Sequence, residues 1–154
     1  MEDNKFGTVF IGGSETIGAL PENAVAWLDH FIEANEHFLI GDCSGVDLAL
    51  QNYLASRKYQ KVTVHYSGDA CRFNVGKWEA KQVALKHEDT MIAASNCAFL
   101  IWDGCSEETK NSIEKIRERG LPIFIYRTDL GRLRVVRRNC KLNKKTTRRK
   151  LYEQ

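Results

Sequence analysis

The sequence predicts an α/β protein with a doubly wound, mostly parallel five-stranded Rossmann-like sheet that carries helices on both faces. Three observations support this fold class. Short apolar runs recur along the chain, segments with helical periodicity lie between them, and each connection is long enough for a crossover helix. This order of elements is typical of parallel sheets with right-handed connections.

The first two strand–helix units occupy the N-terminal part of the chain. The apolar run 6–11 is the first predicted strand, and Pro21 and Glu22 suit the first turn of the helix that follows it. Residues 37–40 are the second strand and residues 48–58 the second helix. Apolar residues recur at helical spacing in both helices: Ala24, Trp27, Leu28, Phe31 and Ile32 in the first, and Leu48, Leu50, Tyr53 and Leu54 in the second.

The middle of the chain combines a strand, a long loop and a helical segment. Residues 62–66 are the third predicted strand, and residues 67–77 form a polar loop of a length that is often functional in compact domains. Residues 78–94 have a helical pattern, in which Met91 and Ile92 are expected to face the core.

The last two strands are also apolar runs. Residues 97–102 are apolar throughout, which predicts a central strand covered on both faces. Ser106 is a good helix start, and Gly120 is expected to end that helix. The fifth strand follows at 121–126, with Pro122 at its entry, where proline is tolerated.

Charge divides the 154-residue chain into a domain, predicted over residues 1–129, and a basic C-terminal tail over 130–154. The domain contains 13 of the 23 Lys and Arg residues and 19 of the 20 Asp and Glu residues, so its formal charge is −6. The other ten basic residues lie in the tail. Nucleic-acid contact is one prediction for such a tail, and a solvated tail or an arm on a partner subunit are the alternatives.

Cysteine usage and the N-terminus bear on the cellular compartment. The five cysteines include no CxxC pair and their number is odd, so neither a disulfide framework nor a metal site is predicted. The first residues lack the profile of a signal peptide, and no apolar run is long enough to span a membrane. We therefore expect a cytoplasmic protein with no membrane contact and no bound cofactor.

Polar, glycine-bearing loops follow four of the predicted strands. In a parallel sheet these loops meet beyond the carboxyl ends of the strands, where ligands bind at the switch in strand order. The sequence therefore predicts a small-molecule site at this edge. Its candidate residues are Gly12, Gly13, Ser14, Gly41, Asp42, Ser44, Gly45, Asp47, Arg72, Asn74, Asp103, Gly104, Ser106 and Thr109.

The loop chemistry excludes some ligand classes and suggests roles for the candidates. The spacing of Gly12, Gly13 and Gly18 is neither a dinucleotide fingerprint nor a P-loop, which disfavours hydride transfer and ATP hydrolysis. Small and hydroxyl-bearing residues suit phosphate or sugar, Arg72 and Asn74 could close over a ligand, and the three aspartates could bind hydroxyls.

Four sequence blocks resemble a known family: Ile11–Ser14, Gly41–Asp47, Arg72–Glu79 and Phe99–Thr109, all within about residues 6–127. The resemblance is to the SLOG superfamily. It is nearest to small YpsA- and DUF2493-related proteins, and more distant to the LOG phosphoribohydrolases and DNA-processing protein A. It implies a Rossmann-like fold with a pocket for nucleotides or nucleotide-derived ligands.

Two positions depart from the family pattern. Glu108 stands where the family usually has glycine, which adds charge where a phosphate would approach, and Ser112 stands where the LOG hydrolases have glutamate. We therefore expect a homo-oligomeric sensor or binding protein for a nucleotide-derived small molecule, with a non-phosphorylated nucleoside as one option. The alternative is a hydrolase that cleaves the N-glycosidic bond of a nucleoside monophosphate, with Asp103 or Glu79 as the catalytic residue.

Overall fold

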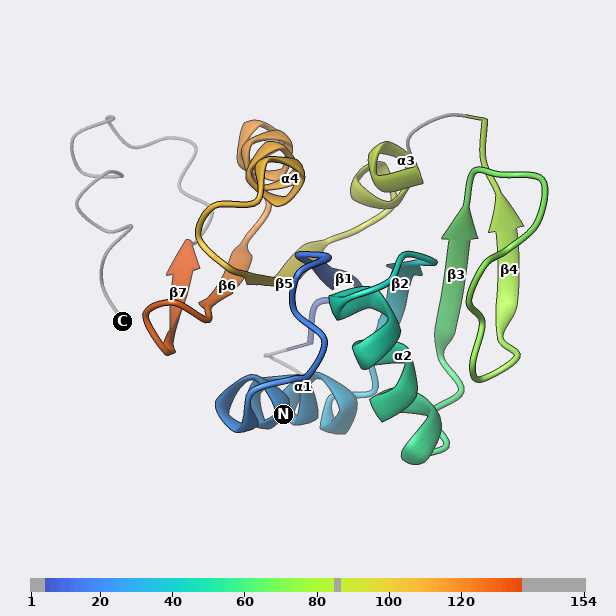
Figure 1. Cartoon of the computed structure of the whole chain (residues 1–154), viewed down its shortest axis with the longest axis horizontal. Helices are drawn as coiled ribbons and strands as arrows, with labels where there is room; N and C mark the ends of the chain where they lie inside the picture. The colour runs from blue at the N-terminus through green and yellow to red at the C-terminus, as the bar shows by residue number, and fades with distance from the viewer. Residues whose placement is uncertain (1–4, 85–86, 137–154) are drawn as a thin grey trace.

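The computed structural model describes residues 5–84 and 87–136 (Figure 1). In this part of the chain a seven-stranded sheet has the order β4-β3-β2-β1-β5-β6-β7, and every neighbouring pair is parallel except β6 with β7. The elements are β1 (Thr8–Gly13), α1 (Glu22–Glu33), β2 (His37–Gly41), α2 (Val46–Ser56), β3 (Val62–Tyr66), β4 (Glu79–Gln82), α3 (His87–Ala93), β5 (Cys97–Trp102), α4 (Glu107–Glu118), β6 (Ile123–Arg127) and β7 (Arg132–Val136). The predicted α/β class and mostly parallel sheet are confirmed, whereas the predicted number of five strands is wrong.

The sheet is doubly wound about the pair β1 and β5, where the strand order reverses. Helices α1 and α2 lie on one face and α3 and α4 on the other (Figure 1). Alternate residues of β1 serve the two faces, because Val9 and Ile11 join the apolar cluster beneath α1 and α2, while Phe10 joins the cluster beneath α3 and α4. The carboxyl ends of β1 and β5 therefore lie between two layers of helices, each packed on the sheet through its own apolar core.

Strand β4 corrects the prediction of a helix over residues 78–94. Residues 79–82 pair in parallel with β3 and are all exposed, so β4 is an edge strand of charged and polar residues. The loop before it takes the place of a crossover helix, with Trp78 buried and its Nε1 donating to the carbonyl of Tyr59 at 2.7 Å. The helix itself is shorter than predicted, but Met91 and Ile92 are buried as expected.

Strand β7 lies in the segment that the sequence placed in the basic tail. It pairs antiparallel with β6 after a turn in which Gly131 has a φ of +69°, and its Leu133 is buried in the core. The sheet therefore extends past residue 129, to Val136. The rest of the predicted tail, and with it most of the basic residues that suggested nucleic-acid contact, lies outside the described residues.

The helices of the described residues are too short or too polar to cross a bilayer.

Candidate functional site

The loops after β1, β2, β3 and β5 meet at one edge of the sheet, as predicted. Ser14 joins three of them, because its carbonyl accepts a hydrogen bond from Val46 N at 3.1 Å and its Oγ accepts one from Asp103 N at 3.2 Å. The loop after β3 is tied in by Arg72 N, which donates to Asp42 Oδ2 at 2.9 Å. This edge lies at the reversal of strand order, the position at which open α/β sheets bind ligands.

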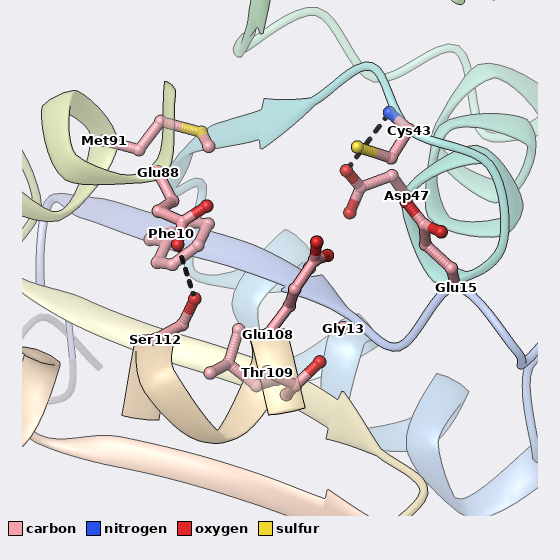
Figure 2. A pocket seen from close by; sticks show the side chains of 12 residues that line it. Phe10, Gly13, Glu15, Cys43, Asp47, Glu88, Met91, Glu108, Thr109 and Ser112 are labelled. Atoms are coloured by element: carbon pink, nitrogen blue, oxygen red, sulfur yellow. Dashed lines mark hydrogen bonds between the residues drawn. The ribbon is translucent and has the colours of Figure 1, made fainter. Parts of the chain in front are cut away.

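A small pocket opens at this edge between α3 and α4 (Figure 2). Its volume is about 60 Å³, and it adjoins an open groove of about 640 Å³, with which it shares Glu15, Cys43, Glu88 and Glu108. The pocket is lined by Phe10, Gly12, Gly13, Glu15, Cys43, Asp47, Glu88, Met91, Leu100, Glu108, Thr109 and Ser112. The groove adds Ser67, Arg72, Asn111, Glu114, Lys115 and Glu118.

The floor of the pocket exists because Gly12 has no side chain. Gly12 follows Phe10 on the same face of β1, and a Cβ placed on it would lie 3.1 Å from Asp47 Oδ1 and 3.6 Å from the Phe10 ring. Phe10, Met91 and Leu100 make the floor apolar. A flat ring with polar edges is the kind of group that such a floor accommodates.

Asp47 is the buried carboxylate of the pocket, with a residue exposure of 8%. Its Oδ2 accepts a hydrogen bond from Cys43 N at 3.3 Å (Figure 2). Its Oδ1 faces the space above Gly12. Burial, helped by the charges of Asp42 and Glu15, raises the pKa of Asp47 to about 7, although the Cys43 hydrogen bond and Arg72 oppose this. At neutral pH Asp47 can therefore either donate or accept a hydrogen bond.

The pocket as a whole is acidic. Glu15, Asp47, Glu88 and Glu108 line it, and its lining contains no Lys or Arg. Figure 2 shows Glu108 between the Asp47 side of the pocket and Glu88. Burial raises the pKa of the Cys43 thiol to about 11, with Asp47 adding to the effect, so the thiol stays neutral. This electrostatic environment disfavours a bare anion.

Asp103 holds the turn before α4 together instead of lining the pocket. Its Oδ1 accepts hydrogen bonds from Cys105 N at 2.9 Å and Ser106 N at 2.7 Å, and its Oδ2 accepts from the hydroxyls of Ser106 and Thr16, both at 2.6 Å. Burial favours the neutral acid, but these hydrogen bonds outweigh it and hold the pKa of Asp103 well below its usual range. Ser106, predicted to bind phosphate, thus already donates its backbone N–H and its hydroxyl to a carboxylate of the chain.

Asp42 and Arg72 form an ion pair at the side of the groove. The Asp42 side chain is 3% exposed and that of Arg72 is 59% exposed, with Nη2 of the arginine 3.3 Å from Oδ1 of the aspartate. Arg72 lines the groove, so it is placed to meet a ligand there. Asn74 instead bonds the backbone of Trp78 twice, through Nδ2 at 2.8 Å and Oδ1 at 3.0 Å, which folds the loop on itself.

Most of the other predicted residues bring the loops together. Gly13 packs so closely on β5 that a Cβ would overlap the carbonyl of Ile101, and Gly45, at a φ of +77°, packs in the same way on the backbone of Glu15. Among the predicted binding residues, Gly12, Gly13, Asp47 and Thr109 line the pocket and Arg72 lines the groove. Neither cavity is lined by Ser14, Gly41, Asp42, Ser44, Gly45, Asn74, Asp103, Gly104 or Ser106.

Glu79, the second predicted catalytic residue, lies far along the sheet from this edge. It begins β4 and pairs with Thr63 near the start of β3, whereas the loops of the site follow the ends of the strands. We therefore assign it no catalytic role.

The sequence analysis missed several residues that line the pocket. Glu15 directly follows the predicted Gly12–Ser14 loop, so its place in the sequence could have identified it as a pocket residue. No such indication exists in the sequence for Glu88, because that residue comes from α3 on the far side of the pocket. Its Oε2 accepts a hydrogen bond from Ser112 Oγ at 3.4 Å, which places a carboxylate beside the position where the LOG pattern has glutamate (Figure 2).

Among residues 5–84 and 87–136, no group of three or more His, Cys, Asp or Glu side chains is arranged to hold a metal ion. The chain matches no protein-family model, and no curated protein or solved structure is significantly similar to it.

Proposed function

We propose that this chain binds a nucleoside or another nucleotide-derived small molecule, with the base in the pocket between α3 and α4. One observation carries the proposal. A buried carboxylate, Asp47, faces a pocket with an apolar floor at the reversal of strand order, and Gly12 leaves that carboxylate accessible.

The pocket and the groove suit chemically different parts of the proposed ligand. The pocket is too small for a whole nucleoside but has an apolar floor for a ring, and Asp47 Oδ1 can accept a hydrogen bond from an amino or imino group. The adjoining groove has a volume within the usual range for ligand sites and can take a sugar, with Arg72 at its side.

The charge of the site favours ligands without a terminal phosphate. The four carboxylates of the pocket would repel such a group, and the backbone N–H of Ser106 already donates to Asp103. The resemblance to the SLOG superfamily suggests the same general ligand class. Because the pocket and groove provide contacts for recognising a ligand, we assign the chain a role as a sensor or binding protein.

A thermal-shift screen of nucleosides, nucleobases and their monophosphates tests this proposal. A ligand at about 100 times its Kd stabilises the folded state by about 2.7 kcal/mol, which raises Tm by several degrees. We expect one or more nucleosides to do so, and the shift to disappear in Asp47→Ala. Asp69→Ala, an exposed residue that lines neither cavity, is the matched control and should retain the full shift. No stabilisation by any member of the panel would overturn the proposal.

A second candidate is cleavage of the N-glycosidic bond, and the raised pKa of Asp47 favours it. A carboxyl group with a pKa of about 7 suits general acid–base catalysis at neutral pH. Asp103 is less suitable, because its pKa is lowered and each of its oxygens already accepts two hydrogen bonds. In this scheme Asp47 would protonate the leaving base as the C–N bond breaks, water would attack the ribosyl carbon and lose a proton to solvent, and Asp47 would be protonated again from solvent.

Chromatographic detection of free base tests the catalytic candidate. Asp47→Asn should lower base release by at least about 10²-fold, the usual contribution of general acid–base catalysis, while Asp103→Asn should retain far more activity when folded. Ligand binding without base release would leave the binding proposal standing and end the catalytic one.

A further inference from the structure

The pocket holds more negative charge than the described chain neutralises. Within residues 5–84 and 87–136, Glu88 forms an ion pair with Lys115 at 3.6 Å, whereas the other three acidic residues of the pocket, Glu15, Asp47 and Glu108, form none. A ligand that enters the pocket therefore meets carboxylates without fixed positive charges among them.

The basic residues of the adjoining groove are engaged elsewhere. Arg72 Nη2 lies 3.3 Å from Asp42 Oδ1, and Lys115 Nζ is closer to Asp89 Oδ1, at 2.7 Å, than to the pocket glutamate. Neither of these two aspartates lines the pocket or the groove. A positively charged ligand would thus not have to displace a basic side chain from the pocket carboxylates.

Asp47 is a buried carboxylate with one unsatisfied oxygen. The residue is 8% exposed, and its Oδ2 accepts a hydrogen bond from Cys43 N. In the described part of the chain, Oδ1 has no hydrogen-bond partner, and it faces the space above Gly12. A buried carboxylate is costly unless it is both paired and hydrogen-bonded, so a cationic N–H donor is the group that would compensate it best.

The polar groups of the pocket are mainly acceptors. Ser112 Oγ donates to Glu88 Oε2 at 3.4 Å, and Thr109 Oγ1 lies 3.4 Å from Ser14 Oγ, so both hydroxyls of the lining already have partners. A neutral base would turn a ring nitrogen or carbonyl acceptor toward carboxylates. A base that is methylated on a ring nitrogen and positively charged offers an amino donor instead, with a methyl group for the apolar floor.

We propose that the preferred ligand is a nucleoside with a positively charged base, such as one methylated on a ring nitrogen, and that Asp47 and Glu108 recognise that charge. This inference rests on the proposed nucleoside site and adds the charge of the base to it. The base lies on the apolar floor with its amino group on Asp47 Oδ1. Its charge is compensated by Glu108, which Figure 2 shows between the Asp47 side of the pocket and Glu88.

Titration calorimetry with matched methyl isomers tests this inference. 1-Methyladenosine and 3-methylcytidine are cations at neutral pH, because methylation of the ring nitrogen makes the base strongly basic, whereas N6-methyladenosine and 5-methylcytidine are neutral. We expect at least one cation to bind about tenfold more tightly than its neutral isomer and than the unmodified nucleosides. Salt at about 0.5 M should weaken the binding of the cation much more than that of its isomer.

Charge-removing variants assign the preference to residues. Glu108→Gln should lower the preference for the cation about threefold and Asp47→Asn about tenfold, while Glu107→Gln, an exposed residue that lines neither cavity, should leave it unchanged. Circular dichroism verifies that each variant is folded. An equal loss of preference in Glu107→Gln would overturn the roles of Asp47 and Glu108.

The same titrations separate this inference from the proposed function. Any neutral nucleoside that binds as tightly as both cations would show that the carboxylates only exclude anions, which overturns the inference and leaves the nucleoside site standing. No binding by any nucleoside, charged or neutral, would overturn both.

Discussion

The two sides of the pocket are built on different principles. On the β1–β2 side, backbone packs on backbone through Gly13 and Gly45, and one carboxylate, Asp47, is buried. On the α3–α4 side, the half-buried Glu88 and the exposed Glu108 meet the pocket from helices. The comparison indicates that the first side fixes the shape of the site, whereas the second adds two of its four carboxylates without close backbone packing. Changes on the two sides should therefore affect stability and ligand choice separately.

Gly13→Ala should have the largest effect on stability. The new Cβ would overlap the carbonyl oxygen of Ile101, so β1 and β5 would have to separate at the centre of the sheet. We expect a loss of at least about 3 kcal/mol in the free energy of unfolding, measured by urea denaturation.

Gly18→Ala is the control for this substitution. No atom lies within 4 Å of a Cβ at Gly18, and its φ is not in the left-handed region. Its effect should stay within about 1 kcal/mol and can be stabilising, because alanine restricts the unfolded chain. Equal losses in the two variants would contradict the idea that close backbone packing fixes the first side.

Asp47→Asn should stabilise the protein at alkaline pH while it weakens the site. The pKa of Asp47 is raised to about 7 in the folded state, so between about pH 4 and pH 7 the folded state binds more protons than the unfolded state. Wild-type stability therefore falls as pH rises through this window, and the full penalty applies above pH 7. Asparagine cannot ionise, so the variant should gain about 1–3 kcal/mol at pH 8 and show a flatter profile.

Denaturation at pH 5 and pH 8 measures this difference. Asp69→Asn, on the exposed loop, serves as the reference and should follow the wild-type profile. If Asp47→Asn is less stable than wild type at pH 8, the carboxylate has a structural role that its burial does not reveal.

Asp103→Ala should destabilise the protein by about 1–3 kcal/mol, because it leaves four hydrogen-bond donors in the loop without their charged acceptor. The pKa of Asp103 is lowered in the folded state, so its stabilising contribution is present above its unfolded pKa of about 4 and is lost as pH falls toward its folded value. Acid titration of unfolding free energy in wild type and variant should converge below pH 4. Parallel curves down to pH 2 would contradict the assigned role of the hydrogen bonds.

Glu108→Gln should leave stability within about 0.5 kcal/mol, because the side chain is exposed, and should change ligand preference instead. Removing this charge should strengthen the binding of a nucleoside monophosphate relative to its nucleoside by about fivefold, equivalent to about 1 kcal/mol. Glu107→Gln is the neighbouring control, since Glu107 lines neither cavity. Titration calorimetry with both ligands gives the ratio, and an equal change in the two variants would sink the assignment.

Much of the fold could be predicted because it depends on local pattern. The apolar runs that became β1, β2, β3, β5 and β6 are recognisable without knowing their neighbours. Strand β4 is different, since Glu79–Gln82 consists of helix-compatible residues and is extended because the edge of β3 offers it hydrogen bonds. Strand β7 was hidden in the same way among basic residues of the presumed tail.

The candidate site shows the same division. The sequence by itself determined that glycine-bearing loops follow the strands, and parallel pairing was enough to bring them to one edge. Only the tertiary structure decided which aspartate faces the pocket. Asp103 and Asp47 both follow strand ends, but Asp103 is turned to the α4 start by four hydrogen bonds, while Asp47 is left above the space at Gly12. The tertiary structure also brought Glu88 to the pocket from α3. Side-chain orientation and contacts across the two layers depend on residues distant in the chain, which local sequence cannot specify.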